Sequence, residues 1–292
     1  MHIDILDFSI ADNLPGTPLQ QSGTYAAVLC SFGCQSAVIE AREDGALIAR
    51  ARIYTRRIGP LRVVWLPRGP VWATAATPNQ MRRTLSALPG AAPWRALWAM
   101  GADAGQPHRG LPIARGLQMA ELDLTQDDAA RRSSQNGKWR NTLKRAEGAG
   151  LTITTAAVDI TDTAPLLAQE AAQRAKRRYA ALPHRFTEKW VGLAPSDTLM
   201  LVASEAGTPV AFMLMLLHTP TATYHIGWTG PRGRRLNAHT LLLWRASCSL
   251  AQMGYARLDL GSIDAARSPG ITRFKVGAGA NLRNLGPTTL CL

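Results

Sequence analysis

Cysteine is scarce in this sequence, which has four cysteines in 292 residues. Cys30, Cys34, Cys248 and Cys291 match neither the paired spacing of a zinc site nor the dense framework of a disulfide-rich domain. Isolated cysteines of this kind are typical of small buried apolar side chains in a reducing compartment. We therefore expect neither a disulfide framework nor a metal site.

Long apolar runs are also absent. The run over residues 210–217 suits a strand and is far shorter than the ~20 residues that a membrane-spanning helix needs. The first residues, Met1-His2-Ile3-Asp4, differ from the basic and then apolar start of a secretory signal. These two observations predict a cytoplasmic protein, which we expect to be a monomer.

Acidic residues are outnumbered by basic ones. Asp and Glu number 20 against 33 Lys and Arg, which gives a formal net charge of +13 and a pI near 10.4. Such a charge attracts phosphates, RNA or acidic small molecules. The basic residues gather in runs within 131–145, 174–178 and 232–235. Solvated helix faces account for such runs equally well, so charge alone leaves nucleic-acid binding open.

The first half of the chain has the pattern of a β-meander. Short β-prone segments separated by glycine-containing turns cover residues 25–31, 36–41, 46–55 and 61–67. Glu43-Asp44-Gly45 is typical of a hairpin turn. Thr77 and Pro78 predict the start of a helix that runs to about Leu88. A loop is predicted over residues 101–112, and a further strand over 118–124.

From Thr125 the pattern becomes helical and then alternates. Helices are predicted over residues 127–148, 163–179, 187–193 and 238–253. Strands are predicted over residues 151–155, 199–204, 209–218, 224–229 and 255–260. Asn237 is the expected cap of the helix that begins at Ala238. The order strand, helix, helix, strand, strand, strand, helix, strand is that of an acyl-CoA N-acetyltransferase domain, the GNAT fold.

Particular motifs narrow this pattern to a family. They are Lys138-Trp139-Arg140-Asn141-Thr142-Leu143-Lys144-Arg145-Ala146-Glu147-Gly148-Ala149-Gly150, the helix from Asn237-Ala238-His239 to Trp244, Leu258-Asp259-Leu260-Gly261, Arg273-Phe274-Lys275-Val276-Gly277 and, in the first half, Leu66-Pro67-Arg68-Gly69-Pro70. Together they resemble the FemAB family of aminoacyl transferases, more closely in the second half than in the first. The resemblance implies an α+β fold, an α/β sandwich, with two GNAT-like domains in tandem at residues 1–125 and 126–292. Each domain is expected to be a mixed, mostly antiparallel sheet flanked by helices.

The resemblance also implies an activity. Founding members of the family transfer an amino acid from aminoacyl-tRNA to the peptide amine of a cell-wall precursor. For this chain the resemblance implies an N-acyltransferase that binds the tRNA acceptor end, with aminoacyl-tRNA as co-substrate and no permanently bound cofactor. The acceptor is expected to be anionic and to carry an amine, as a peptidoglycan precursor, a peptide or a small amine does. A lipid-linked acceptor would bring peripheral association with a membrane.

By the same resemblance, the Phe-Lys pair lies at the tRNA acceptor end. Phe274 would contact the terminal adenosine, and Lys275 would lie near its phosphate or the departing ribose oxygen. A fixed cation at that place would stabilise the alkoxide that the collapsing intermediate sheds. The rest of the expected donor-binding set is Arg273, Arg232, Arg235 and Asn237. The plain alternative is a solvated loop lysine beside a core phenylalanine.

Further candidates for binding the acceptor or a phosphate come from charge and position. Arg140 and Lys144 are four residues apart and share one helix face, and with Asn141 they suit either phosphate contact or plain exposure. Tyr224 and Trp228 are separated by an even number of positions in the predicted strand 224–229, in which side chains alternate between the two faces. We therefore expect both on one face of the strand, above a cleft or in the core.

Two carboxylates and two histidines complete the candidates. Asp259 and Asp264 end a predicted strand, where either one is a candidate to take a proton from the attacking ammonium. Turn or capping roles fit both carboxylates better. His225 and His239 have no partner at metal or triad spacing, so we interpret them as structural.

Two other functions stay open. An acyl-CoA-dependent GNAT N-acetyltransferase acting on a small amine would hold the pyrophosphate of acetyl-CoA on backbone N–H groups. The corresponding loop, residues 232–238, is basic but has bulky side chains where the backbone must approach the phosphates. A non-enzymatic RNA-binding protein would fit the charge, but the chain has neither an RNP-type aromatic pair nor the GXXG loop of a KH domain.

One departure from the family pattern concerns the residues after the Phe-Lys pair. Related sequences carry a bulky aromatic residue and paired glycines there, whereas this chain has Gly277-Ala278-Gly279-Ala280. The geometry around the expected acceptor end is therefore open.

Overall fold

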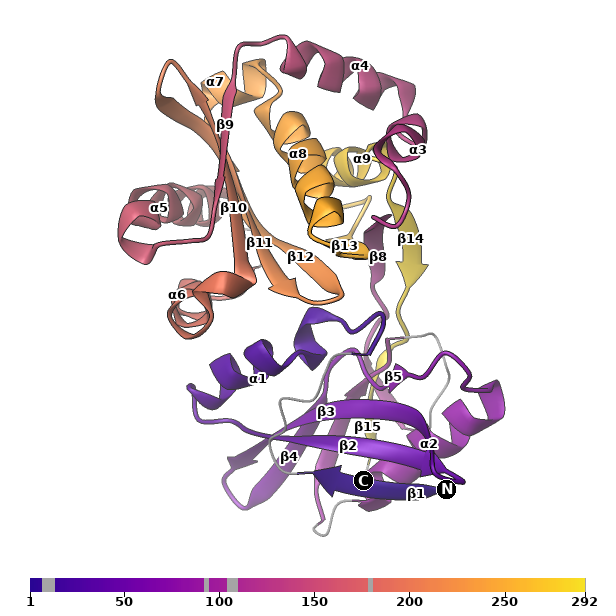
Figure 1. Cartoon of the computed structure of the whole chain (residues 1–292). Coiled ribbons are helices and arrows are strands. Elements are labelled where there is room, and N and C mark those ends of the chain that lie inside the picture. Colours follow the sequence, from indigo (N-terminus) through magenta and orange to yellow (C-terminus); the bar gives the residue numbers. More distant parts are fainter. Residues whose placement is uncertain (7–13, 92–94, 104–109, 178–180, 292) are drawn as a thin grey trace. The chain divides into compact units, whose positions relative to one another are not determined.

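The computed structural model describes residues 1–6, 14–91, 95–103, 110–177 and 181–291 (Figure 1). The chain forms two compact units. Unit 1 comprises residues 1–118 and 283–292, and unit 2 comprises residues 119–282. This division differs from the expected boundary after residue 125, because the strand Gln118–Asp123 already belongs to the sheet of unit 2 and the end of the chain returns to unit 1 as a strand. Among the described residues, no helix is both long and apolar enough to cross a bilayer.

Unit 1 is built on a mixed sheet. Its strands are β1 (His2–Leu6), β2 (Gln35–Glu43), β3 (Ala46–Ile58), β4 (Leu61–Leu66), β5 (Val71–Trp72), β6 (Leu97–Gly101), β7 (Leu111–Ala114) and β15 (Thr288–Cys291). They lie in the order β1-β2-β3-β4-β6-β15-β7, with β5 paired to β3. The pair β4 and β6 is parallel and the other neighbours are antiparallel. Half of the predicted loop over residues 101–112, the part at 104–109, lies outside the described residues.

Helices α1 (Gly23–Cys30) and α2 (Pro78–Ala91) pack on this sheet. The predicted start of α2 is confirmed, because Thr77 Oγ1 accepts the N–H of Gln80 at 3.3 Å and Pro78 takes the first turn. The prediction of a strand over residues 25–31 is wrong. Ser22 caps α1 by accepting the N–H of Tyr25 at 3.2 Å, and burial of one helix face outweighs the β preference of its side chains.

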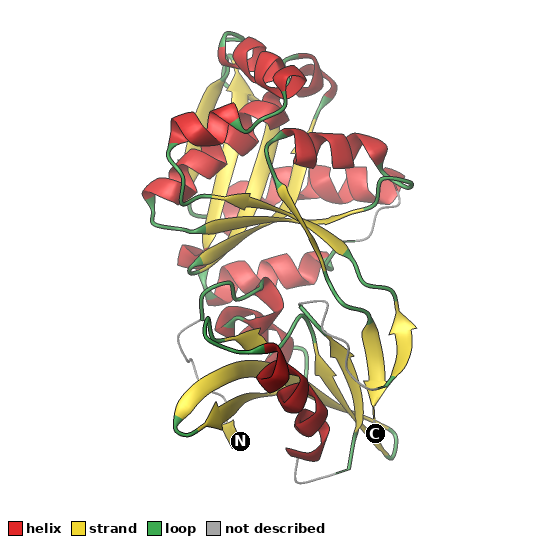
Figure 2. Ribbon diagram, turned by 90° about the vertical axis from the view of Figure 1, so that its right-hand side faces the viewer, coloured by secondary structure: helices red, strands yellow, loops and turns green. Residues whose placement is uncertain are grey.

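Unit 2 is a second sheet with helices on both faces (Figure 2). Its strands are β8 (Gln118–Asp123), β9 (Thr152–Ala156), β10 (Thr198–Glu205), β11 (Thr208–His218), β12 (Thr221–Thr229), β13 (Arg257–Ile263) and β14 (Asn281–Asn284). Its helices are α3 (Asp128–Ser133), α4 (Gly137–Glu147), α5 (Ile160–Arg177), α6 (His184–Leu193), α7 (Pro231–Arg235), α8 (Ala238–Gln252) and α9 (Pro269–Gly277). The strand order is β14-β8-β13-β12-β11-β10-β9.

The predicted order of elements appears in unit 2 as β9, α5, α6, β10, β11, β12, α8, β13. Figure 1 shows α5 and α6 on one side of the sheet and α4, α8 and α9 on the other. The core on the α8 side includes Leu201, Met213 and Leu242. The core on the other side includes Leu167 and Phe212.

The single helix predicted over residues 127–148 is wrong, because two helices cover that range. Asp127 caps α3 by accepting the N–H of Ala130, and α3 ends at Ser133. Asn136 then caps α4 by accepting the N–H of Lys138 at 2.9 Å. A second capping residue therefore restarts the helix in a new direction.

The last strand described returns to the first sheet. β8 follows β7 along the chain and opens unit 2, where it lies in the sheet between β14 and β13. β15 follows β14, yet it lies in the sheet of unit 1 between β6 and β7. The sheet of unit 1 is therefore completed by a strand that the chain makes after unit 2.

Candidate functional site

The parallel pairing of β12 with β13 is short. It covers Thr221–Thr223 and Arg257–Asp259, and both strands continue beyond it. Where a parallel ladder stops part-way along two strands, main-chain groups must find other partners. One such group is the carbonyl of Ser262 on β13, which accepts a hydrogen bond from Lys275. The site is therefore built on the part of β13 that extends past the ladder.

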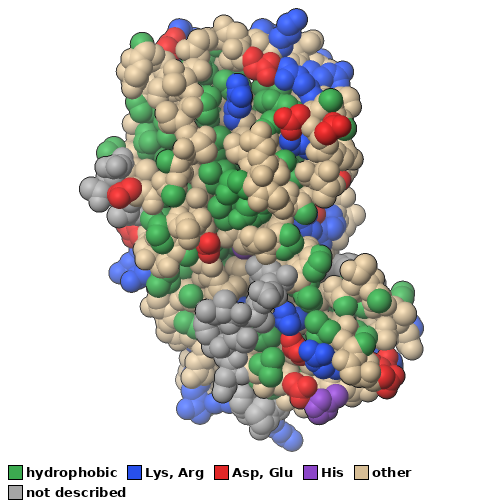
Figure 3. Space-filling view, viewed as in Figure 1, with side chains coloured by type: hydrophobic (Ala, Val, Ile, Leu, Met, Phe, Trp, Pro, Cys, Tyr) green, Lys and Arg blue, Asp and Glu red, His purple; other side chains and the backbone are tan. Residues whose placement is uncertain are grey.

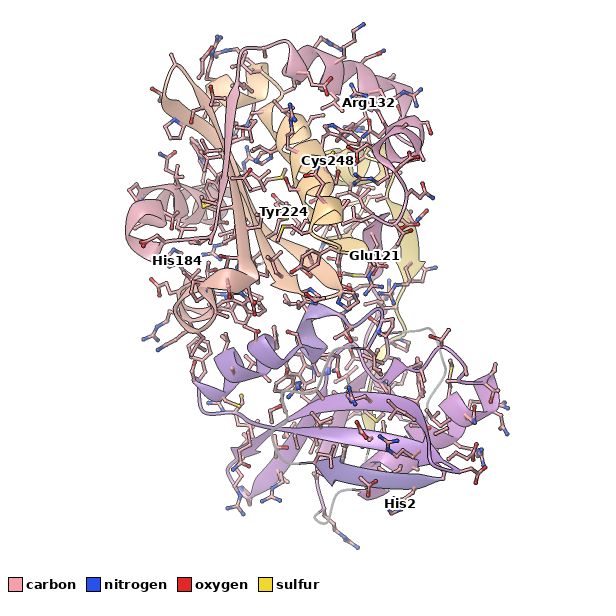
Figure 4. The ribbon with its side chains drawn as sticks, viewed as in Figure 1. His2, Glu121, Arg132, His184, Tyr224 and Cys248 are labelled. Carbon is pink, nitrogen blue, oxygen red and sulfur yellow. The ribbon has the colours of Figure 1, made fainter. Side chains whose placement is uncertain are left out.

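A β-bulge lies at the same point of β12. The register with β11 runs from Leu214 opposite Ile226 to Met215 opposite Tyr224, which leaves His225 as the extra residue. Because a bulge reverses the alternation of side chains, residues on its two sides change faces. Tyr224 packs in the core on the α8 side and extends toward α8, while Trp228 packs against the core on the α5 side (Figure 4). The prediction that Tyr224 and Trp228 share one face is therefore wrong.

Lys275 is the best-defined charged group of the site. It lies on α9, is 8% exposed, and its Nζ donates to the carbonyl oxygen of Ser262 at 2.8 Å. Burial lowers the pKa of Lys275 to about 8, while the nearby Asp259 acts to raise it. The alternative of a solvated loop lysine is thus wrong: the side chain is enclosed and fixed.

The two candidate carboxylates have different environments. Asp259 is 1% exposed and accepts the N–H of Gly261 at 2.7 Å, which stabilises a turn in which Gly261 has a φ of +81°. Asp264 is exposed and accepts the N–H groups of Ala266 and Arg267 at 3.1 and 3.0 Å. Both carboxylates have turn roles, and Asp259 also lies close enough to Lys275 to favour its charged form.

Phe274, beside Lys275, belongs to an aromatic cluster. Its ring centroid lies 6.3 Å from that of Trp139 on α4 and 6.5 Å from that of His239 on α8. A Cβ on Gly277 would lie 3.0 Å from Trp139 Cδ1, so Trp139 fills the space beside the end of α9. Sequence reasoning quoted Trp139 within a motif but assigned it no role. Only packing reveals that it orients Phe274.

The two histidines are neutral at physiological pH. Burial lowers the pKa of His225 to about 4, and its Nε2 lies 2.7 Å from Thr187 Oγ1. Burial also lowers the pKa of His239 to about 4, and its Nε2 lies 3.0 Å from the carbonyl oxygen of Trp228. Hydrogen bonds thus hold both rings in place, and the two histidines are structural residues. The described residues contain no cluster of three or more His, Cys, Asp or Glu suited to a metal.

The basic loop before α8 is largely helical. The N–H groups of Arg234, Leu236 and Asn237 donate to carbonyls of the same turn at 3.1, 3.1 and 3.2 Å. Arg232 forms a two-bond ion pair with Glu205, at 2.6 Å from Nε and 2.5 Å from Nη2, and this bond lowers the pKa of Glu205. The expected donor residues Arg232 and Arg235 lie on this turn, and both are exposed.

Asn237 precedes α8, but the expected side-chain cap is wrong. Its side chain makes no capping hydrogen bond, and its backbone is left-handed with a φ of +56°. The carbonyl of Asn237 instead accepts the N–H of Thr240 at 3.0 Å. Asn tolerates the left-handed region better than most residues, which explains its presence at this turn.

The expected phosphate-binding residues lie on α4. Arg140, Asn141 and Lys144 are all exposed, and Lys and Arg side chains gather over this helix (Figure 3). Arg140 Nη1 also donates to the carbonyls of Ser133 and Gln135, both at 2.7 Å, so it fixes the turn between α3 and α4. Arg273 on α9 is exposed as well.

A cavity of about 100 Å³ adjoins the end of α9 within unit 2. Trp139, Trp244 and Gly279 are among its lining residues. The guanidinium carbons of Arg131 and Arg132 lie 5.6 and 5.5 Å from the Trp244 ring centroid, a cation–π arrangement (Figure 4 labels Arg132). Sequence reasoning had placed Arg131 and Arg132 only in a basic run.

The sheet of unit 2 is mixed and has helices on both faces. Its parallel strands β12 and β13 separate part-way along, and a bulge lies at the separation. These features together define a GNAT-type acyltransferase. Residues 133–279, which are 147 of the 292 residues, match the family model described as an acetyltransferase (GNAT) domain. The chain belongs to this family, and it is an acyltransferase.

Solved structures extend the likeness to the whole chain. FemX is 12% identical with a TM-score of 0.73, over 93% of this chain and 92% of that one. A tandem GNAT protein from the clavulanic acid biosynthesis pathway is 11% identical with a TM-score of 0.50, over 99% and 98%. The C-terminal domain of a putative lysylphosphatidylglycerol synthetase from Agrobacterium fabrum is 18% identical with a TM-score of 0.51, over 82% and 80%. No curated protein matches the chain. The expected tandem GNAT fold of FemAB type is confirmed.

Proposed function

We propose that this chain transfers an aminoacyl group from aminoacyl-tRNA to an amine acceptor. The observation that carries the proposal is the ammonium of Lys275, which is buried, fixed on the Ser262 carbonyl and placed beside the half-buried ring of Phe274. A cation that is held in place before the substrate arrives costs no reorganisation when charge develops.

The chemistry requires such a cation at the leaving group. The acceptor amine attacks the ester carbonyl of the aminoacyl-tRNA, and a C–N bond forms while the nitrogen loses a proton. The C–O bond to the terminal ribose then breaks, and the ribose oxygen takes a proton. In this scheme Lys275 stabilises the departing oxygen, and Phe274 stacks on the terminal adenine.

The loop before α8 supports tRNA rather than acyl-CoA as the donor. A pyrophosphate at a helix N-terminus is held by backbone N–H groups that point at it. Here the N–H groups of Arg234, Leu236 and Asn237 are already bonded within the turn. Arg232 is bonded to Glu205, so its charge is compensated. Acetyl-CoA could bind through these three N–H groups only if the turn unwound.

The acceptor is proposed to be anionic and to carry a free amine, as a peptidoglycan precursor, a peptide or a small amine does. The exposed cations of α4, Arg140 and Lys144, would contact its phosphate or carboxylate groups. Fold similarity to FemX and to a putative lysylphosphatidylglycerol synthetase accords with aminoacyl transfer.

A transfer assay tests the proposal. The protein would be incubated with tRNA charged with labelled amino acids, or with labelled acetyl-CoA, and with a pool of amines. We expect label to leave tRNA for an amine, and the rate to fall at least about 100-fold in Lys275→Met. Lys189→Met, which changes an exposed lysine of α6, is the control and should keep the full rate.

The alternative is acyl transfer from acetyl-CoA to a small amine, which the description of the matched family favours. Label that moves only from acetyl-CoA would establish this alternative. Full activity of Lys275→Met with tRNA as donor would refute the role given to Lys275.

A further inference from the structure

The hairpin of β3 and β4 in unit 1 extends an apolar tip into solvent. Gly59 and Pro60 form its turn, and the flanking Ile58 and Leu61 are 61% and 58% exposed. Trp65, further along β4, is 38% exposed. Large apolar side chains this exposed, and close together, are uncommon without a partner.

The register of the hairpin sorts its side chains by face. Ile58 pairs with Leu61, so the two side chains share one face, and the parity of β4 places Trp65 on that face too. Arg57 pairs with Arg62 on the opposite face, whereas Arg56 pairs with Val63 on the face of Ile58. Two cations directly opposite each other give this face of the hairpin a positive charge, which attracts an anionic surface.

The surrounding sequence is also basic. From Gly45 to Ala102 the chain contains nine arginines and no Asp or Glu, although Arg50, Arg68 and Arg83 pair with acidic residues outside this stretch. Arg56 and Arg57 are exposed immediately before the tip. The hairpin thus joins an apolar tip to cations with no acidic residue in the same stretch of chain. A nucleic acid would use the cations but would leave Ile58 and Leu61 in water.

We propose that this hairpin docks unit 1 on the surface of an anionic lipid bilayer. Ile58 and Leu61 enter the boundary between headgroups and acyl chains, and Trp65 lies at headgroup level, where tryptophan is favoured. Arg57 and Arg62 contact lipid phosphates from the other face. The association is peripheral and reversible, and it does not depend on which acyl donor the enzyme uses.

Co-sedimentation of the full chain with vesicles tests the proposal. One set of vesicles is phosphatidylcholine mixed with phosphatidylglycerol, and the other is phosphatidylcholine alone. We expect binding to the mixed vesicles that weakens as salt is added. The double variant Arg57→Gln/Arg62→Gln should bind about 25-fold more weakly, because each cation near an anionic surface contributes about fivefold, or 1 kcal/mol. Ile58→Ser/Leu61→Ser should weaken binding at least about tenfold.

Two control variants distinguish docking by the hairpin from non-specific binding through the charge or the exposed apolar side chains of other parts of unit 1. Arg82→Gln/Arg95→Gln removes two exposed cations elsewhere in unit 1, and Leu111→Ser/Ile113→Ser removes two exposed apolar side chains of β7. Both controls should bind vesicles within about twofold of the unmodified chain. Equal loss in a control and in the corresponding hairpin variant would overturn the proposal.

Two further results would also overturn it. If Arg57→Gln/Arg62→Gln loses tRNA binding while vesicle binding is unchanged, the cations serve RNA. If Ile58→Ser/Leu61→Ser abolishes self-association in the absence of vesicles but leaves vesicle binding unchanged, the tip is covered by a second copy of the chain.

Discussion

Replacing Lys275 with methionine should make unit 2 more stable near neutral pH while lowering the transfer rate at least about 100-fold. Lys275 has an ordinary pKa of 10.5 in the unfolded chain and a pKa of about 8 in the folded one, because burial disfavours the ammonium. The unfolded chain therefore holds this proton more tightly between these two pH values. It follows that the stability of the unmodified protein rises as pH increases from about 8 to 10.5.

The size of the effect comes from the same pKa difference. A gap of about 2.5 units, at about 1.4 kcal/mol per unit, means that the charged Lys275 costs about 3.5 kcal/mol below pH 8. Methionine has a similar length and no charge, but it loses the bond from the ammonium to Ser262, worth about 1.5 kcal/mol. Lys275→Met should therefore gain about 2 kcal/mol at neutral pH, and this gain should vanish near pH 10.

Pulsed hydrogen exchange along a urea series, resolved by peptide, measures the unfolding of unit 2 without interference from unit 1. The free energy of unfolding is compared between the unmodified chain and Lys275→Met from about pH 7 to about pH 10. Lys189→Met, the exposed control, should show a constant difference. If the difference in the free energy of unfolding between Lys275→Met and the unmodified chain is also constant with pH, it refutes the argument. That result would mean that burial does not destabilise the charged form of Lys275.

Three other measurements test neighbouring parts of the site. The transfer rate should fall above about pH 8 as Lys275 loses its proton, and a pH–rate profile that keeps rising through pH 9 would contradict its role as a cation. NMR titration should find His225 and His239 neutral down to about pH 5, and stability should fall as pH drops from 6.5 towards 4; an imidazole that titrates near 6.5 would refute this. Gly279→Ala should cost about 1–2 kcal/mol in urea unfolding, because Gly279 has a φ of +91° and a Cβ would lie 2.6 Å from Ser134 Oγ; an unchanged midpoint would show that the turn relaxes.

Much of unit 2 could be predicted from sequence because its elements have clear periods. The apolar run of β11 and the helical stripe of α8 are local signals, so their type and order are confirmed. The prediction of a strand at residues 25–31 failed because the only local signal for a helix there was one capping serine, Ser22. The effect of such a cap depends on the packing of the helix that it starts.

The site was less predictable than the fold. Phe274 and Lys275 came from a family resemblance, and no local pattern reveals that Lys275 is buried. The bulge at His225 leaves no mark in the alternation of residue types, so the faces of Tyr224 and Trp228 could not be assigned. Arg140 looked like a phosphate ligand because charge is visible in sequence, whereas its hydrogen bonds to two carbonyls of the α3–α4 turn are not.

The return of β15 to the sheet of unit 1 has a consequence for how the chain folds during synthesis. The ribosome makes most of unit 1 first, yet the strand that fills the place between β6 and β7 consists of residues 288–291. Until those residues emerge, β6 and β7 each have an edge without its final neighbour. The sheet of unit 1 therefore cannot be completed before residues 288–291 emerge, and until then the edges of β6 and β7 favour aggregation.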